Sequence, residues 1–161
     1  VTKLSNILGV SVDYLLGVSD IRNPLPSNAY PVGDTVKIPV VGVIRAGEPI
    51  LVAENIIGYE VVEKDAAKNG EYFYLKVTGD SMIGARIHDG DLVLVRRQDD
   101  VDDGEIAVVL LDCEEATLKK IYRQNGQVIL QAENPKYPPR VIKRGDVRII
   151  GKVIEVKFKL E

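Results

Sequence analysis

A serine that follows a glycine turn is the first residue of the chain whose surroundings favour chemistry. Ser81 lies in VTGDSMIGARIHDGDLVLV (77–95), where strand-forming residues end and Gly79 lets the backbone turn tightly. The hydroxyl in such a turn is accessible, and the nearby backbone N–H groups of Asp80 and Ser81 can point at a carbonyl oxygen, as in an oxyanion hole. Most loop serines are only solvated or cap a turn, so catalysis here requires a partner base.

The sequence offers one histidine and several lysines as that base. His88 is the only histidine, lies in the turn IHDGD, and is expected to be exposed to water. Lysine is a cation at neutral pH and becomes a base only where burial lowers its pKa. Lys119 and Lys120 are neighbours on one predicted strand and therefore face opposite sides. The alternation leaves open which of the two points inward, and both could be surface lysines.

Many short strands must position these side chains. Turn sequences (HDGD, DDGE, QNGQ and KRGD) separate them, and Asn125-Gly126 predicts the tip of a hairpin. Only residues 63–70 are expected to form a helical turn or two. We therefore expect a mainly β, mostly antiparallel domain over residues 35–161. Segments rich in β-branched and aromatic residues predict its strands at 36–44, 72–79, 91–96, 105–111, 116–123, 127–132 and 147–160.

The first 34 residues differ in character from this β domain. Apolar residues at helix-like spacing predict two short helices within residues 1–20, too small to bury a core alone. Residues 21–34, IRNPLPSNAYPVGD, contain three prolines and a glycine and are expected to form an extended linker. The sequence thus predicts a helical N-terminal remnant, a linker and a β domain.

Composition argues against several classes of protein. Apolar residues make up 45% and charged residues 28%, as in a folded soluble domain. The net charge of -3 and the pI of about 5.3 disfavour a DNA-binding domain. The single Cys113 excludes an internal disulfide, and one cysteine with one histidine excludes a Cys/His zinc site, so no metal or cofactor is expected. We see no signal peptide and no bilayer-spanning run of about 20 apolar residues, and expect a cytoplasmic protein.

Five segments resemble, in order and spacing, the protease domain of LexA, UmuD and phage repressors. They are TGDSM, IHDGDLVLV, DVDDGEIAVV, EATLKKIYR and ILQAENPKYPPRVI, and they span about residues 37–160. The resemblance implies a LexA and signal-peptidase-like antiparallel β-rich fold with a short helical N-terminal remnant. It also implies Ser81 as the nucleophile and Lys119, 38 positions on, as the general base. It gives Lys120 and His88 no catalytic role.

The same resemblance implies that the substrate is the Ala46–Gly47 bond of the chain itself, within VVGVIRAGEPILVAENI. The small alanine suits a narrow pocket, and glycine lets the chain bend toward the nucleophile. Arg45 stands where a small residue is often found. This difference is expected to affect how fast the bond is cut more than whether it is cut. Anchoring of the loop in an apolar groove is expected from Val43, Ile44, Ile50 and Leu51.

The start of the chain, LSNILGVSVDYLLGVSD, resembles the last two helices of the lambda-repressor-like helix-turn-helix domain. The chain is therefore expected to begin inside a DNA-binding domain: the full-length parent would bind operator DNA, and this chain would not. An activated RecA filament on single-stranded DNA is the expected trigger of cleavage, which would inactivate repression in a DNA-damage or prophage-type response. A homodimer contact is expected on the C-terminal strand at Ile149, Val153 and Val156.

Three alternatives remain beside this interpretation. A UmuD-like polymerase accessory protein also cleaves itself, but the helical start and proline linker argue against it. A signal peptidase shares the serine–lysine fold, but the internal Ala–Gly segment and the absence of a membrane anchor argue against it. A non-cleaving repressor module that only dimerises or senses a partner would carry the Ser–Lys pair as a relic. Self-cleavage at alkaline pH discriminates between this module and a peptidase.

Overall fold

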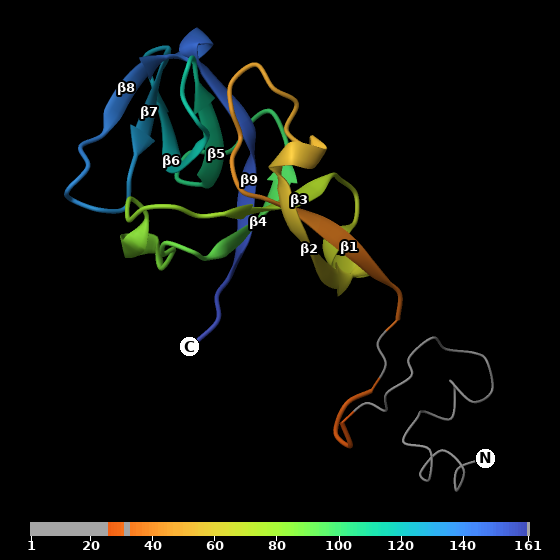
Figure 1. Ribbon diagram of the computed structural model, residues 1–161. Helices are drawn as coiled ribbons and strands as arrows, with labels where there is room; N and C mark the ends of the chain where they lie inside the picture. Colours follow the sequence, from red (N-terminus) through yellow and green to blue (C-terminus); the bar gives the residue numbers. More distant parts are fainter. Residues whose placement is uncertain (1–25, 31–32, 161) are drawn as a thin grey trace, which may run out of the picture. The chain divides into compact units, whose positions relative to one another are not determined.

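The computed structural model describes residues 26–30 and 33–160 of the chain (Figure 1). The chain divides into two units, Val1–Asp34 and Thr35–Glu161. In the first unit, the described residues include a turn in which the Ala29 N–H donates to the Pro26 carbonyl at 2.9 Å. The two helices predicted within residues 1–20, and much of the predicted linker, lie outside the described residues.

The second unit is built on one mainly antiparallel sheet, so the predicted fold class is confirmed. Its strands follow the order β2-β1-β3-β4-β9-β5-β6-β7-β8, and among the described strands only β1 and β3 pair in parallel. The strands are β1 (Thr35–Val41), β2 (Ile56–Glu63), β3 (Tyr72–Lys76), β4 (Leu92–Arg97), β5 (Ile106–Leu111), β6 (Thr117–Gln124), β7 (Gln127–Gln131), β8 (Arg140–Lys143) and β9 (Val147–Lys157).

The helical content of the described residues is limited to single 3-10 turns. They are η1 (Ala53–Asn55), η2 (Lys64–Ala67), η3 (Ile83–Ala85) and η4 (Arg144–Asp146), and η2 is the helical turn predicted within 63–70. No helix in this part of the chain is long and apolar enough to cross a membrane.

Seven of the strands were predicted, and two were not. The predicted hairpin tip is confirmed, because β6 and β7 pair directly across Asn125 and Gly126, whose φ angles of 51° and 75° are the positive values that this turn requires. The missed strands lie at the two edges of the sheet. Strand β2 pairs only with β1, and β8, four residues long, pairs only with β7.

Strand β9 joins the two halves of the sheet. It pairs with β4 along one edge and with β5 along the other, and Gly151 belongs to both ladders, opposite Arg97 and Val108. A Cβ added at Gly151 would lie 2.4 Å from the Arg96 carbonyl oxygen and 2.7 Å from a Val95 methyl carbon. Strands β9 and β4 therefore approach here as closely as a glycine allows.

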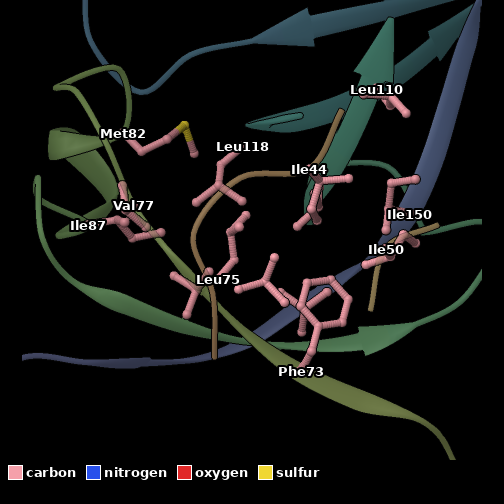
Figure 2. Packing of buried hydrophobic residues seen from close by; sticks show 14 residues of the cluster. Ile44, Ile50, Phe73, Leu75, Val77, Met82, Ile87, Leu110, Leu118 and Ile150 are labelled. Carbon is pink, nitrogen blue, oxygen red and sulfur yellow. The ribbon is translucent and has the colours of Figure 1, made fainter. Parts of the chain in front are cut away.

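The largest core cluster holds the serine turn in place. Met82, the residue after Ser81, is 2% exposed and packs in this cluster with Ile87 from the end of the same turn. Leu118 of β6 and Ile44 from the segment after β1 belong to the same cluster (Figure 2). A fully buried side chain of this kind contributes about 1.5–3 kcal/mol, so the turn and β6 are fixed to one core.

Candidate active site

The turn that carries Ser81 is tied to the turn before β4. The Gly79 N–H donates to Asp89 Oδ1 at 2.8 Å, and the Gly90 N–H donates to the Val77 carbonyl at 2.8 Å. Gly79 has a φ of +86°, which a residue with a side chain rarely adopts. The side chain of His88 is exposed, as the sequence predicts for a turn residue. Ser81 is thus presented by a hydrogen-bonded double turn.

Lys119 of β6 points at the Ser81 hydroxyl. Its Nζ lies 3.5 Å from Ser81 Oγ, 3.0 Å from Thr117 Oγ1 and 3.0 Å from the Leu118 carbonyl oxygen. The neighbouring Lys120 instead pairs with Glu133, with 3.0 Å between Nζ and Oε1. The structure therefore brings together Ser81 and the first lysine of the pair, which the strand alternation alone left open.

Burial lowers the pKa of Lys119 below the ordinary lysine value, and the positive charge of Arg140 lowers it further, while the carboxylate of Glu114 acts in the opposite direction. A neutral lysine amine has two N–H donors and one lone pair. Thr117 Oγ1 and the Leu118 carbonyl are the nearer acceptors and can take both donors. The lone pair is then left for the Ser81 hydroxyl, which is the arrangement of a general base.

The backbone N–H groups of Asp80 and Ser81 lie beside this pair. Within residues 26–30 and 33–160, the Ser81 N–H donates no hydrogen bond to a backbone acceptor. The hydrogen bond from the Tyr137 hydroxyl lowers the pKa of the Asp80 carboxyl, and the Asp80 N–H, which faces its own carboxylate, lowers it further. The Asp80 carbonyl accepts a hydrogen bond from Asn134 Nδ2 at 2.8 Å. The role of the two N–H groups as oxyanion donors stays a prediction.

A groove adjoins Ser81. It is lined by Ser81, Met82 and three segments, 42–44, 75–78 and 115–118. Ala46 and Gly47 are not among the lining residues, although two of the predicted anchors, Val43 and Ile44, are.

The segment 43–51 is anchored in the core at two places. Ile44 is 1% exposed and Ile50 is 7% exposed, and both belong to the cluster that holds Met82. Leu51 and Ala46 are partly buried against the same cluster. Gly47 is exposed and has a φ of +84°, so the bond between Ala46 and Gly47 lies in a surface turn.

This segment leads the Ala46–Gly47 bond away from the dyad. Arg45 forms an antiparallel bridge with Glu115, and the Ala116 N–H donates to the Ile44 carbonyl at 2.8 Å. Because the two chains of an antiparallel pair run in opposite directions, Ala46 and Lys119 leave the bridge in opposite directions. Lys119 is four residues from Glu115, so its backbone lies roughly 13 Å along the strand from the bridge. Figure 1 agrees, since the orange loop after β1 lies apart from the yellow-green turn at η3.

The three residues predicted at a dimer contact lie on β9. Ile149, Val153 and Val156 are partly buried and pack against the core clusters of the chain. Their neighbour Ile154 is 39% exposed. A contact with a second copy stays a prediction.

Sequence reasoning missed the residues that hold the dyad and its turn. Thr117 and the Leu118 carbonyl contact the Lys119 amine, and Asn134 and Tyr137 contact Asp80. The only signal for them is that they fall within the segments EATLKKIYR and ILQAENPKYPPRVI, which carry the resemblance described above.

Comparisons with known proteins find one family and several relatives. Residues 39–154 match the family described as Peptidase S24-like. The chain is 46% identical over 120 residues to the LexA repressor of Oleidesulfovibrio alaskensis, covering 74% of this chain and 58% of that protein. It is 45% identical over 128 residues to LexA repressor 1 of Geobacter sulfurreducens, covering 78% of this chain and 63% of that protein. It is 41% identical over 135 residues to the LexA repressor of Acetivibrio thermocellus, covering 84% of this chain and 62% of that protein. The chain thus matches about three fifths of the length of these curated relatives.

Proposed function

The chain belongs to the Peptidase S24-like family, and on that basis we propose that residues 35–161 are a serine–lysine peptidase that cuts the Ala46–Gly47 bond of its own chain. The observation that carries the proposal is the 3.5 Å distance between Lys119 Nζ and Ser81 Oγ, at a lysine whose pKa is lowered by burial. Relatives that carry the name LexA repressor favour a repressor over a polymerase accessory protein or a signal peptidase.

The reaction begins when neutral Lys119 takes the proton of the Ser81 hydroxyl. Ser81 Oγ then forms a bond to the carbonyl carbon of Ala46, and the resulting oxyanion accepts hydrogen bonds from the N–H groups of Asp80 and Ser81. Protonated Lys119 returns its proton to the amine of Gly47 as the peptide bond breaks. Water, deprotonated by Lys119, hydrolyses the ester on Ser81. Because the substrate is part of the same chain, the reaction occurs once per molecule.

Self-cleavage and its pH dependence test this proposal together. We expect incubation of the chain between pH 7 and 10, followed by intact mass spectrometry, to give two products that meet at Ala46 and Gly47. The rate should rise with pH as Lys119 loses its proton. It should reach half of its maximum below about pH 10.4, the ordinary pKa of lysine, because burial lowers the pKa of Lys119. A rate independent of protein concentration would show that the reaction is intramolecular.

Failure to cleave at any pH, with or without activated RecA on single-stranded DNA, would contradict the proposal. The domain would then be better described as a non-cleaving dimerisation module. Products that meet at another bond would contradict the assignment of Ala46–Gly47 and leave the dyad to be tested separately.

We also propose that the loop must leave the Arg45–Glu115 bridge before cleavage. The side-chain ion pair is exposed and long, at 3.9 Å, so it contributes little. The hydrogen bond between Ile44 and Ala116, together with the burial of Ile44, holds the loop in the observed position. A trigger such as the RecA filament would act by favouring those chains in which the loop has moved and the Ala46–Gly47 bond lies at Ser81.

A reversible disulfide tests this step. Facing residues of an antiparallel pair have Cα atoms about 4.5–5.5 Å apart, within the range that a disulfide spans. In a background with Cys113→Ser, the double substitution Arg45→Cys/Glu115→Cys should stop cleavage when oxidised and permit it when reduced. The Cys113→Ser chain without the pair is the matched control, and it should cleave equally under both conditions. Equal cleavage by the oxidised and reduced double variant would show that the bridge need not open.

A homodimer through β9 is the assembly we propose. Pairing between β9 and β5 ends at Lys152, whereas pairing with β4 continues to Lys157. Among the described strands, residues 153–157 therefore have one edge without a partner, where a second copy could add its own β9. In the parent protein, which we propose binds operator DNA, cleavage would separate the DNA-binding and dimerising parts. Light scattering would measure whether the chain has the molar mass of a dimer.

A further inference from the structure

The loop between β7 and β8 holds the serine turn on both sides of Ser81. Before the serine, Asn134 Nδ2 donates to the Asp80 carbonyl at 2.8 Å. After it, the Gly84 N–H donates to the Glu133 carbonyl at 2.7 Å, and a Cβ at Gly84 would lie 2.6 Å from the same oxygen. A third contact joins the Tyr137 hydroxyl to the carboxylate of Asp80.

The contact from Asn134 determines the direction of a catalytic donor. The peptide unit between Asp80 and Ser81 is planar and trans, as are the other peptide bonds of the described residues. In such a unit the C=O and the N–H point in opposite directions. When Asn134 holds the Asp80 carbonyl on one side, the N–H of Ser81 must therefore point to the other side.

Asn134 is itself held in the orientation that this requires. Its Oδ1 accepts a hydrogen bond from the Lys136 N–H at 3.0 Å, so its Nδ2 is the atom left to donate. The Tyr137 N–H closes the turn by donating to the Asn134 carbonyl at 3.0 Å. Gly79, with its positive φ, precedes Asp80 and has no side chain that could restrain the turn. Asn134 therefore supplies the hydrogen bond that prevents this peptide from rotating.

We propose that Asn134 is a positioning residue that orients the Ser81 N–H toward the oxyanion of the tetrahedral intermediate. It acts through the Asp80–Ser81 peptide and does not touch the substrate. The inference rests on the proposed function, since it assigns Asn134 a role in that same reaction. Tyr137 restrains the side chain of Asp80 and not the peptide, so its hydroxyl contributes less.

The first test compares two changes of identical chemistry at different places. Asn134→Asp retains the acceptor for Lys136 and removes the donor to Asp80, whereas Asn125→Asp makes the same change at the exposed tip of the β6–β7 hairpin. We expect the plateau rate of self-cleavage to fall roughly ten- to hundredfold in Asn134→Asp and to stay unchanged in Asn125→Asp. Asn134→Ala repeats the test without an added charge, and in this variant the pH of half-maximal rate should not move, because Lys119 is untouched.

A wild-type plateau in both Asn134 variants would overturn the inference. A fall accompanied by a shift of the pH midpoint in Asn134→Ala would also overturn it, because the base would then be the disturbed group. Melting temperatures of the variants separate either result from general unfolding.

A second readout does not depend on cleavage. In the unmodified chain, nuclear magnetic resonance should detect a scalar coupling across the hydrogen bond between Asn134 ¹⁵Nδ2 and the Asp80 carbonyl carbon. It should disappear in Asn134→Asp and persist in Asn125→Asp. If the coupling is present and the chain never cleaves, the proposed function is contradicted and the hydrogen bond from Asn134 is not. Cleavage without the coupling would contradict the role of Asn134 alone.

Discussion

Replacement of Ser81 or Lys119 by alanine is expected to reduce self-cleavage by about 10⁴-fold or more, to below detection in a mass-spectrometric time course. Without the Ser81 hydroxyl no atom can form the ester, and without the Lys119 amine no group accepts the hydroxyl proton, because the nearest partners of that amine are a threonine hydroxyl and a backbone carbonyl. The two residues act as a unit, so the double variant should be no slower than either single variant.

Lys120→Ala is the matched control for the lysine. Lys120 is next in sequence and carries the same charge, but it pairs with Glu133 instead of Ser81. Its replacement should leave the cleavage rate within about threefold of wild type. Lys119→Arg should be as inactive as Lys119→Ala, because a guanidinium cannot become neutral at accessible pH. An active Lys119→Arg variant, or an inactive Lys120→Ala variant, would contradict the dyad.

Gly151→Ala is expected to destabilise the domain by about 3 kcal/mol, at the upper end of the range for an overpacked interior. The added Cβ would lie 2.4 Å from the Arg96 carbonyl oxygen and 3.1 Å from the Arg96 carbonyl carbon. These are backbone atoms of β4, so relief requires β4 and β9 to separate. Chemical denaturation, followed by circular dichroism, would measure the free energy of unfolding.

Gly58→Ala provides the comparison for this prediction. Gly58 lies in the edge strand β2, and no atom lies within 4 Å of a Cβ added there. The same chemical change should therefore alter the free energy of unfolding by less than about 0.5 kcal/mol. If both variants lost the same free energy of unfolding, the loss would come from replacing a strand glycine in general, and not from the close approach of β9 to β4.

The predicted strands lie in the interior of the sheet, and the two missed strands lie at its edges. Strand β5, IAVVLL, is central and almost entirely buried. Strand β2, IIGYEVVE, alternates half-buried and exposed residues and is rich in β-branched side chains, so its sequence carries a strand signal that the prediction missed. Strand β8 has four residues and becomes a strand only because β7 provides a partner.

The choice between Lys119 and Lys120 illustrates a second limit. Leu118 is buried in one core cluster and Ile121 in another, so both faces of β6 are covered. Strand alternation identifies an inward face only when the other face meets water. The resemblance to repressor proteases supplied what alternation could not, and the structure then placed Lys119 at the serine.

The contact between Asn134 and Asp80 was beyond local reasoning for a different reason. The two residues are 54 positions apart, and Asn134 lies in a polar, proline-containing loop whose composition predicts only a turn. The contact matters because it sets the direction of the Asp80–Ser81 peptide. That direction depends on how the β7–β8 loop packs on the serine turn. Only three-dimensional structure contains that information.

The central place of β9 has a consequence for the protein during its synthesis. Strands β1 to β4 and the turn with Ser81 form one half of the sheet, strands β5 to β8 with Lys119 form the other, and β9 is the strand that pairs with both. A ribosome makes β9 after all the others, so each half emerges before the strand that joins them exists. On a nascent chain whose β9 is still in the exit tunnel, the two halves are joined only by contacts such as those of the β7–β8 loop with the serine turn, and not by a continuous sheet. If the chain cleaves itself as proposed, synthesis in this order delays the complete site until nearly the whole domain has been made.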